Sequence, residues 1–209
     1  MPDNGTFGVF SSILILVLTE ISLGVAYKFQ TSVIGNDRDS YYASVITISA
    51  IGLLIVALRP KLMVLSDWRL RPRDIVLAAI APILIQSLLM LFDGNPSTTF
   101  VDPTPKRIFF IALLGPAAEE ILCRAIVLRS LVERTSRILA VLIASGIIST
   151  MHESIPRAFV QQTCICIVYI ATDYSIFASI LFHVLLNSFV FFPLIATFQK
   201  WHIYTLWNR

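Results

Sequence analysis

The sequence has little charge. Asp, Glu, Lys and Arg together make up 14% of the residues, whereas a soluble domain usually has about 25%. Hydrophobic residues make up 56%, above the roughly 45–50% of soluble domains. No run of Lys or Arg is dense enough for a nucleic-acid surface, so no nucleic-acid partner is expected. The composition is that of a polytopic membrane protein whose solvent is the lipid bilayer.

Cysteine is scarce as well. Cys123, Cys164 and Cys166 all lie in apolar stretches, where a thiol behaves as a small hydrophobic side chain. The Cys-x-Cys pair has neither zinc-site nor redox-motif spacing. The sequence therefore predicts three buried thiols without a chemical role.

Internal repeats, low-complexity tracts and room for a soluble domain are also missing. We therefore predict a single integral membrane domain over 1–209, an all-α bundle with about seven transmembrane helices (six to eight). Each span needs roughly 20 apolar residues. No Lys or Arg precedes the first apolar run, which is therefore expected to be a retained span. The predicted spans are 8–27, 40–58, 74–93, 107–129, 137–152, 158–173 and 176–197.

Basic residues gather in two loops that seven spans place on one side of the membrane. The first loop, 59–73, carries five of them and the second, 129–137, carries three. Because cytoplasmic loops are enriched in Lys and Arg, this side is predicted to be cytoplasmic.

The fourth predicted span contains charges, in the stretch GPAAEEILCR. An acid or arginine in mid-membrane costs about 2.5–3.5 kcal/mol, so these side chains must face protein or water. Glu120 and Arg124 are four residues apart on a helix and can pair. Glu119 points about 100° away, so it can face another direction while its neighbour is neutralised.

Two further spans bring polar groups toward the same depth. His152 ends the fifth span, and His183 lies inside the seventh with Asn187 one turn later. Helix–helix hydrogen bonding would explain one such residue, and Gln161 and Gln162 are expected to bond in that way. It does not explain two adjacent carboxylates together with two histidines, an asparagine and an arginine.

These motifs resemble those of the CAAX prenyl protease and bacteriocin-processing (CPBP, Abi) family of intramembrane peptidases. The shared pattern is Glu-Glu-x-x-x-Arg at 119–124, a helix ending in His152, and His-x-x-x-Asn at 183–187. The resemblance covers 107–190, the predicted catalytic core. One position departs from the pattern, because Ile148 stands where the family usually has Phe.

The resemblance implies an intramembrane endopeptidase. Glu119 would be the general base, and His152 would help to hold the water. His183 and Asn187 would donate to the oxyanion, while Glu120 and Arg124 would fix the helix around Glu119. Glu120 would be partly replaceable and Glu119 would not.

The same residues allow a mechanism with a metal ion or without one. Glu119, His152 and His183 could form a His₂Glu zinc set, but no His-Glu-x-x-His motif is present. A glutamate mechanism without a cofactor explains the same residues, including Asn187, which is a poor zinc ligand. The favoured mechanism therefore requires no cofactor, and zinc stays the alternative.

The expected partner is a membrane-associated or lipidated, CAAX-like peptide or protein, met in a prokaryotic plasma membrane. Two other functions are considered. A non-catalytic bacteriocin-immunity or binding protein could keep the fold, and a proton-coupled transporter could use buried Glu and His. A transporter is disfavoured because no inverted repeat is found. Oligomeric state and natural substrate do not follow from the sequence.

Overall fold

The computed structural model describes residues 69–93, 104–150 and 154–188, together with Leu14, 46–47, 49–50 and His152. Every element in these ranges is helical. The all-α prediction is therefore confirmed for the described part of the chain. The predicted spans 8–27 and 40–58 lie almost wholly outside it, and the number of spans stays a prediction.

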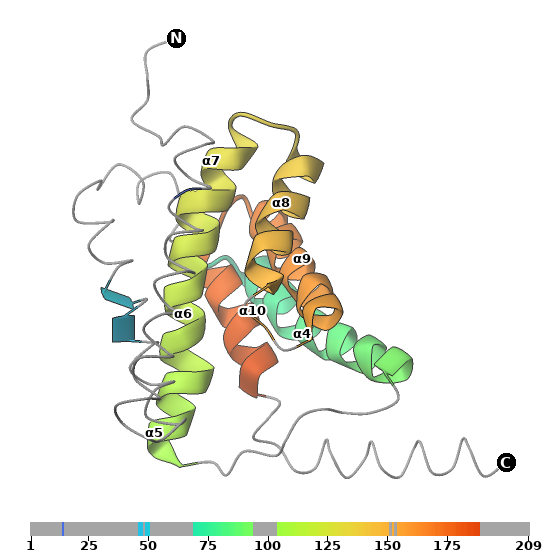
Figure 1. The fold of residues 1–209 in the computed structure, drawn as a ribbon. Helices are drawn as coiled ribbons and strands as arrows, with labels where there is room; N and C mark the ends of the chain where they lie inside the picture. Colours follow the sequence, from blue (N-terminus) through green and yellow to red (C-terminus); the bar gives the residue numbers. More distant parts are fainter. Residues whose placement is uncertain are drawn as a thin grey trace, which may run out of the picture.

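The longest feature is a rod of five helical segments that follow one another without a break (Figure 1). The backbone at its internal joints Leu114, Glu120 and Leu128 stays helical. At about 1.5 Å per residue the rod is roughly 40 Å long, more than the roughly 30 Å of a bilayer core. Its segments are α5 (Pro105–Arg107), η1 (Ile108–Leu114), α6 (Gly115–Glu120), η2 (Ile121–Leu128) and α7 (Arg129–Val132).

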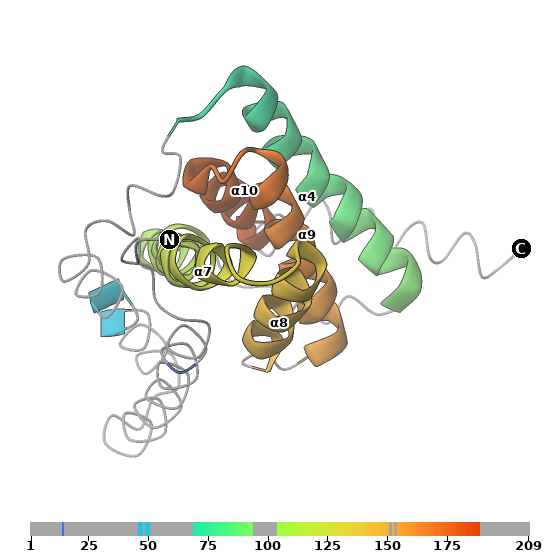
Figure 2. The same cartoon turned by 90° about the horizontal axis from the view of Figure 1, so that it is seen from above.

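Helix α10 (Ile176–Ser188) lies at the centre of the described bundle. It packs against the rod through η1 and α6, and against α9 (Ile155–Ala171) and α4 (Pro72–Asp93). Seen from above, α10 lies between the rod and α4 (Figure 2). The different faces of α10 therefore contact different elements. Side chains on this helix can contribute to a site that several elements share.

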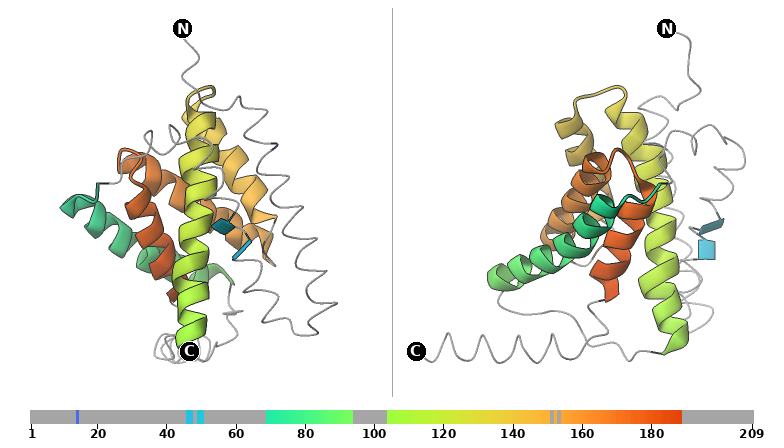
Figure 3. Two further views of the ribbon diagram at one scale, coloured as in Figure 1. Left: turned by 90° about the vertical axis from the view of Figure 1, so that its left-hand side faces the viewer. Right: turned by 180° about the vertical axis from the view of Figure 1, so that it is seen from behind.

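Helices α8 (Arg137–Ser149) and α9 pack against each other, and α8 also packs against η2 and α7. In the left view of Figure 3 the rod lies in front, with α4 to its left and α8 to its right. Ser136 starts α8 because its hydroxyl accepts a hydrogen bond from the amide of Leu139 at 3.3 Å. Pro156 lies in the first turn of α9, where its missing N–H costs no hydrogen bond.

Apolar side chains line both the inside and the outside of the bundle. Inside, a core of buried residues such as Leu122, Ile126 and Tyr169 joins η2, α8 and α9. Outside, α4 leaves side chains such as Ile80 and Leu84 half or more exposed. An outer face of this kind suits lipid better than water.

The helices agree with five predicted spans, although their ends differ. Helix α4 and the rod cover the spans at 74–93 and 107–129. The next two helices are close to 137–152 and 158–173, and α10 is described only as far as Ser188 of the span 176–197. Within the described residues, one helix is by itself long and apolar enough to cross a membrane, over Pro72–Leu89 of α4.

Candidate active site

A stripe of polar residues along α10 joins the elements around it. Ser175 precedes the helix, and Ser179, His183 and Asn187 follow at steps of four residues. Residues four apart lie on one face of a helix. Each of the four bonds to another part of the chain: Ser175 to the segment before α4, Ser179 and His183 to α6, and Asn187 to η1. The central two converge on one carboxylate.

That carboxylate belongs to Glu120, which is completely buried. Its Oε1 lies 2.8 Å from Nδ1 of His183. Its Oε2 accepts a hydrogen bond from the hydroxyl of Ser179 and lies 3.2 Å from Nε of Arg124. The predicted pairing of Glu120 with Arg124 is therefore present. Both carboxylate oxygens are engaged, which is how a buried charge becomes tolerable.

The guanidinium of Arg124 is also fully buried, between η2 and α9. Its Nη2 donates to the side-chain oxygen of Gln162, and lies 3.5 Å from the Gln162 backbone carbonyl. The expectation that Gln162 bonds between helices is confirmed. Nε faces Glu120 at ion-pair distance but without hydrogen-bond alignment, and Nη1 has no hydrogen-bond partner among the described residues.

Glu119 differs from Glu120 in exposure and in hydrogen bonding. Its side chain is 28% exposed, although its Oε2 is buried and has no hydrogen-bond partner in the part of the chain described. This oxygen lies 3.9 Å from Nε2 of His183. The distance is too long for a direct hydrogen bond, and polar groups separated by more than about 3.5 Å are commonly bridged by water.

His183 is thus held between the two glutamates. The side chain is 5% exposed, and Glu120 receives a hydrogen bond from Nδ1. With that hydrogen committed, Nε2 faces Glu119. The His183 ring is thus fixed by the buried carboxylate of Glu120. Its Nε2 faces the Glu119 oxygen that has no hydrogen-bond partner among the described residues.

The other two predicted residues lie further out. His152 is exposed just after α8, and its Nδ1 is 3.1 Å from the carbonyl oxygen of Ile148. A carbonyl only accepts, so this contact puts the hydrogen on Nδ1 and leaves Nε2 as an acceptor. In the described residues no hydrogen bond or ion pair joins His152 to the glutamates. Asn187 donates to the carbonyl oxygen of Ile111 at 3.2 Å.

A zinc site needs three or four converging ligands. Within the described ranges, no three His, Cys, Asp or Glu side chains lie close enough together to hold a metal ion. The alternative set of Glu119, His152 and His183 therefore does not fit a metal in this arrangement. No step below is derived through one.

Sequence reasoning missed Ser179. The spacing of four residues from Ser175 through Asn187 could have revealed it, because it continues the His-x-x-x-Asn pattern toward the N-terminus of the helix. A serine in an apolar helix is common enough that it was not separated from ordinary packing. Its bond to Glu120 makes it part of the site.

The chain matches a known family over part of its length. Residues 103–189 match the family model described as type II CAAX prenyl endopeptidase Rce1-like. The match contains all six predicted site residues together with Ser179. Neither the curated proteins nor the solved structures yield a match to the chain.

Proposed function

Residues 103–189 carry the pattern of the Rce1-like family of CAAX prenyl endopeptidases, and on this premise we propose that the chain is a glutamate-dependent intramembrane endopeptidase. The family implies an integral membrane protease with a peptide or protein substrate at the membrane. The finer proposal is that it hydrolyses a peptide bond in a lipidated, CAAX-like C-terminal segment. We place it in the plasma membrane of a prokaryote as a multi-pass protein.

One observation carries the catalytic proposal: Oε2 of Glu119 has no hydrogen-bond partner among the described residues and lies opposite Nε2 of His183, 3.9 Å away. A water molecule between these atoms would hydrogen-bond to both. Glu119 would remove one proton from the water as the water oxygen forms a bond to the scissile carbonyl carbon. The same proton would pass from Glu119 to the leaving amine when the C–N bond breaks, which restores the carboxylate.

The tetrahedral intermediate needs hydrogen-bond donors for its oxyanion. Asn187 can supply one, because its amide carries two hydrogens and the Ile111 carbonyl uses one of them. His183 can supply a second from Nε2 when the ring carries both hydrogens, since Nδ1 faces Glu120. Glu120 and Ser179 would orient this ring without touching the substrate.

We assign His152 the role of helping to hold the water, at the exposed end of α8. The contact of its Nδ1 with the Ile148 carbonyl supports this role, because it leaves Nε2 available as an acceptor. The proposed mechanism uses no metal. We therefore predict that peptidase activity survives treatment with a zinc chelator. Loss of activity that zinc restores would contradict this part.

The central test is Glu119→Gln in the purified full-length protein, assayed on a prenylated CAAX peptide and on unprenylated membrane peptides. The amide keeps the size of the side chain but removes the base, so kcat should fall about 10²–10⁴-fold. Glu133→Gln is the matched control, because Glu133 is a surface carboxylate paired with Arg129 at 3.3 Å. Thermal unfolding should be nearly unchanged in both variants.

The outcomes separate the candidate functions. Cleavage by wild type and not by Glu119→Gln supports the peptidase. Equal background cleavage by both over the whole peptide panel contradicts it and favours a binding or immunity protein. Proton flux in liposomes that depends on Glu119 would instead favour a transporter.

A further inference from the structure

The turn between α9 and α10 has a backbone conformation that its sequence does not favour. Asp173 and Tyr174 both have positive φ, 54° and 66°. Aspartate tolerates this left-handed region because its short polar side chain can bond to the nearby backbone, whereas a tyrosine side chain cannot. The Tyr174 amide does bond to the Tyr169 carbonyl at 2.8 Å, which closes the end of α9. Two consecutive residues of this kind persist only where the surroundings hold them.

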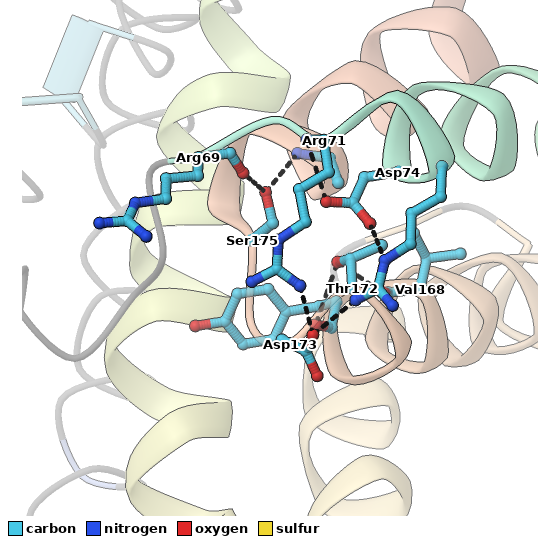
Figure 4. Close-up of polar contacts among 10 residues, drawn as sticks. Arg69, Arg71, Asp74, Val168, Thr172, Asp173 and Ser175 are labelled. Carbon is cyan, nitrogen blue, oxygen red and sulfur yellow. Dashed lines mark hydrogen bonds and ion pairs between the residues drawn. The ribbon is translucent and has the colours of Figure 1, made fainter.

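Asp173 is held by the segment that leads into α4. Arg71 donates from Nη1 to Oδ2 of Asp173 at 2.6 Å, and Arg73 donates from Nη2 to the same oxygen at 2.5 Å (Figure 4). These contacts join positions about 100 residues apart in the chain. We call this three-residue group the Asp173 clamp.

Tyr174 is held from the other side. Its ring lies beneath the guanidinium of Arg129, 3.9 Å from the centroid, and packs edge-on against Tyr169 at 5.5 Å. Arg71 and Arg73, just before α4, and Arg129, at the start of α7, therefore meet at this turn.

The turn continues directly into the catalytic helix. Ser175 is buried and donates from its hydroxyl to the carbonyl oxygen of Arg69 at 2.8 Å (Figure 4). The hydroxyl oxygen of Ser175 in turn accepts a hydrogen bond from the amide of Ala178 at 3.3 Å, which caps the start of α10. One turn later comes Ser179, whose amide bonds to the Ser175 carbonyl and whose hydroxyl bonds to Glu120.

We propose that Asp173 is a positioning residue: by clamping the α9–α10 turn to Arg71 and Arg73, it fixes where α10 begins and so sets His183 against Glu120. Arg71 and Arg73 lie before residue 103, so the working core extends beyond the family match. The exposed ion pairs add little to overall stability. Their effect is to select one conformation of the turn and one register of α10.

The direct test is amide hydrogen exchange of the full-length protein in detergent, comparing wild type with Asp173→Asn. Asparagine keeps the side-chain shape and tolerates positive φ, so the variant removes only the charge. Exchange over 174–183 should rise by about threefold or more, as expected for local opening of a helix start, while the rod exchanges as in wild type. Arg137→Gln removes an exposed charge at the start of α8 and should leave α10 unchanged.

Exchange over α10 that is identical in wild type and Asp173→Asn overturns the proposal. A uniform rise over the whole bundle also overturns it, because it would show general destabilisation. The double change Arg71→Gln with Arg73→Gln should raise exchange at least as much as Asp173→Asn, because it also removes the contact of Arg73 Nε with Asp74 Oδ1 at 3.2 Å. Adding Asp173→Asn to this double change should produce little further rise, since its two partners are already gone.

The catalytic consequence rests on the proposed peptidase function. Asp173→Asn should lower kcat several-fold, up to about tenfold, while KM changes less than about twofold, because misplaced catalytic groups slow the chemical step. If the wild type cleaves nothing, the peptidase proposal fails and the exchange result still decides the clamp. If the wild type cleaves and Asp173→Asn keeps its kcat, positioning by Asp173 is refuted.

Discussion

Two carboxylates organise this molecule, and their surroundings could hardly differ more. Glu120 is completely buried and is bonded to Ser179 and His183, with Arg124 at ion-pair distance. Asp173 lies in the turn before α10, and its side chain is 61% exposed and binds two arginines. Both join segments that are far apart in the sequence. Only one of them is out of reach of water.

The difference decides what each cluster contributes. When a buried partner is lost, the remaining charge has no water to replace it, so the penalty is large. When an exposed partner is lost, water and salt take its place at little cost. The Glu120 cluster therefore holds the bundle together, whereas the Asp173 clamp selects a local conformation. Mutation, salt and pH should separate these two roles.

The largest effect is expected from Glu120→Gln, which leaves Arg124 as a buried charge without its counter-ion. We expect a loss of about 3–5 kcal/mol in the free energy of unfolding, the usual consequence of breaking a buried pair. The measurement is equilibrium unfolding in detergent with Glu133→Gln as the surface control. The sequence-based expectation that Glu120 is partly replaceable concerns catalysis and stays a prediction, because this measurement reports on stability.

A double change sharpens this result. Arg124→Met combined with Glu120→Leu should cost clearly less than the two single changes added together, because neither buried charge is left alone. Strict additivity would show that the pair contributes no coupling. That outcome would remove the contrast with Asp173.

Ser179→Ala should have an intermediate effect. It removes one hydrogen bond to a buried carboxylate oxygen, and a bond to a charged group contributes about 1.5–3 kcal/mol. Ser188→Ala is the matched control on the same helix, since the Ser188 hydroxyl bonds only locally to the Val184 carbonyl at 2.7 Å. Equal stability of the two variants would show that Ser179 does not support Glu120.

The smallest effect on stability is expected at the Asp173 clamp, and it should depend on pH. The hydrogen bond from Arg71, and then that from Arg73, lower the pKa of Asp173 below its ordinary value of 3.8. A depressed folded pKa stabilises the native state above the unfolded value, and this contribution is lost as the pH falls through the folded pKa. The stability difference between wild type and Asp173→Asn should therefore be constant from pH 7 to pH 5 and vanish in stronger acid.

Salt provides an independent check on the same pair. At about 1 M salt the Debye length is about 3 Å, so the difference between wild type and Asp173→Asn should shrink. The loss caused by Glu120→Gln should hardly change, because buried pairs are screened much less. If salt altered both equally, the two clusters would not differ in solvent access as described.

Much of this arrangement could be read from the sequence because burial of charge leaves few solutions. The stretch around Glu119, Glu120 and Arg124 is apolar on both sides, so pairing at four-residue spacing was the economical arrangement, and the structure contains it. The predicted spans also place His183 on another helix, toward the same depth in the membrane. What periodicity provides is the face of a helix and its neighbours along the same helix.

The partners across helices could not be derived in that way. Nothing in the spacing says that His183 turns Nδ1 to Glu120, or that the Asn187 amide reaches the Ile111 carbonyl. Asp173 lies at the end of a predicted span, where a charge costs little, so its sequence position does not indicate a role. Its contact with Arg71 and Arg73 depends on how α4 packs against α10, which is a property of the folded chain.

The four-residue steps along α10 have a mechanical consequence. Successive members of the stripe are offset by about 40°, because a step of four exceeds one turn of 3.6 residues. The bonds made by Ser175, Ser179, His183 and Asn187 therefore grip the helix at four heights and from gradually rotating directions. A shift of α10 by one residue along its axis, or a rotation by one residue about it, would therefore break all four of these contacts together.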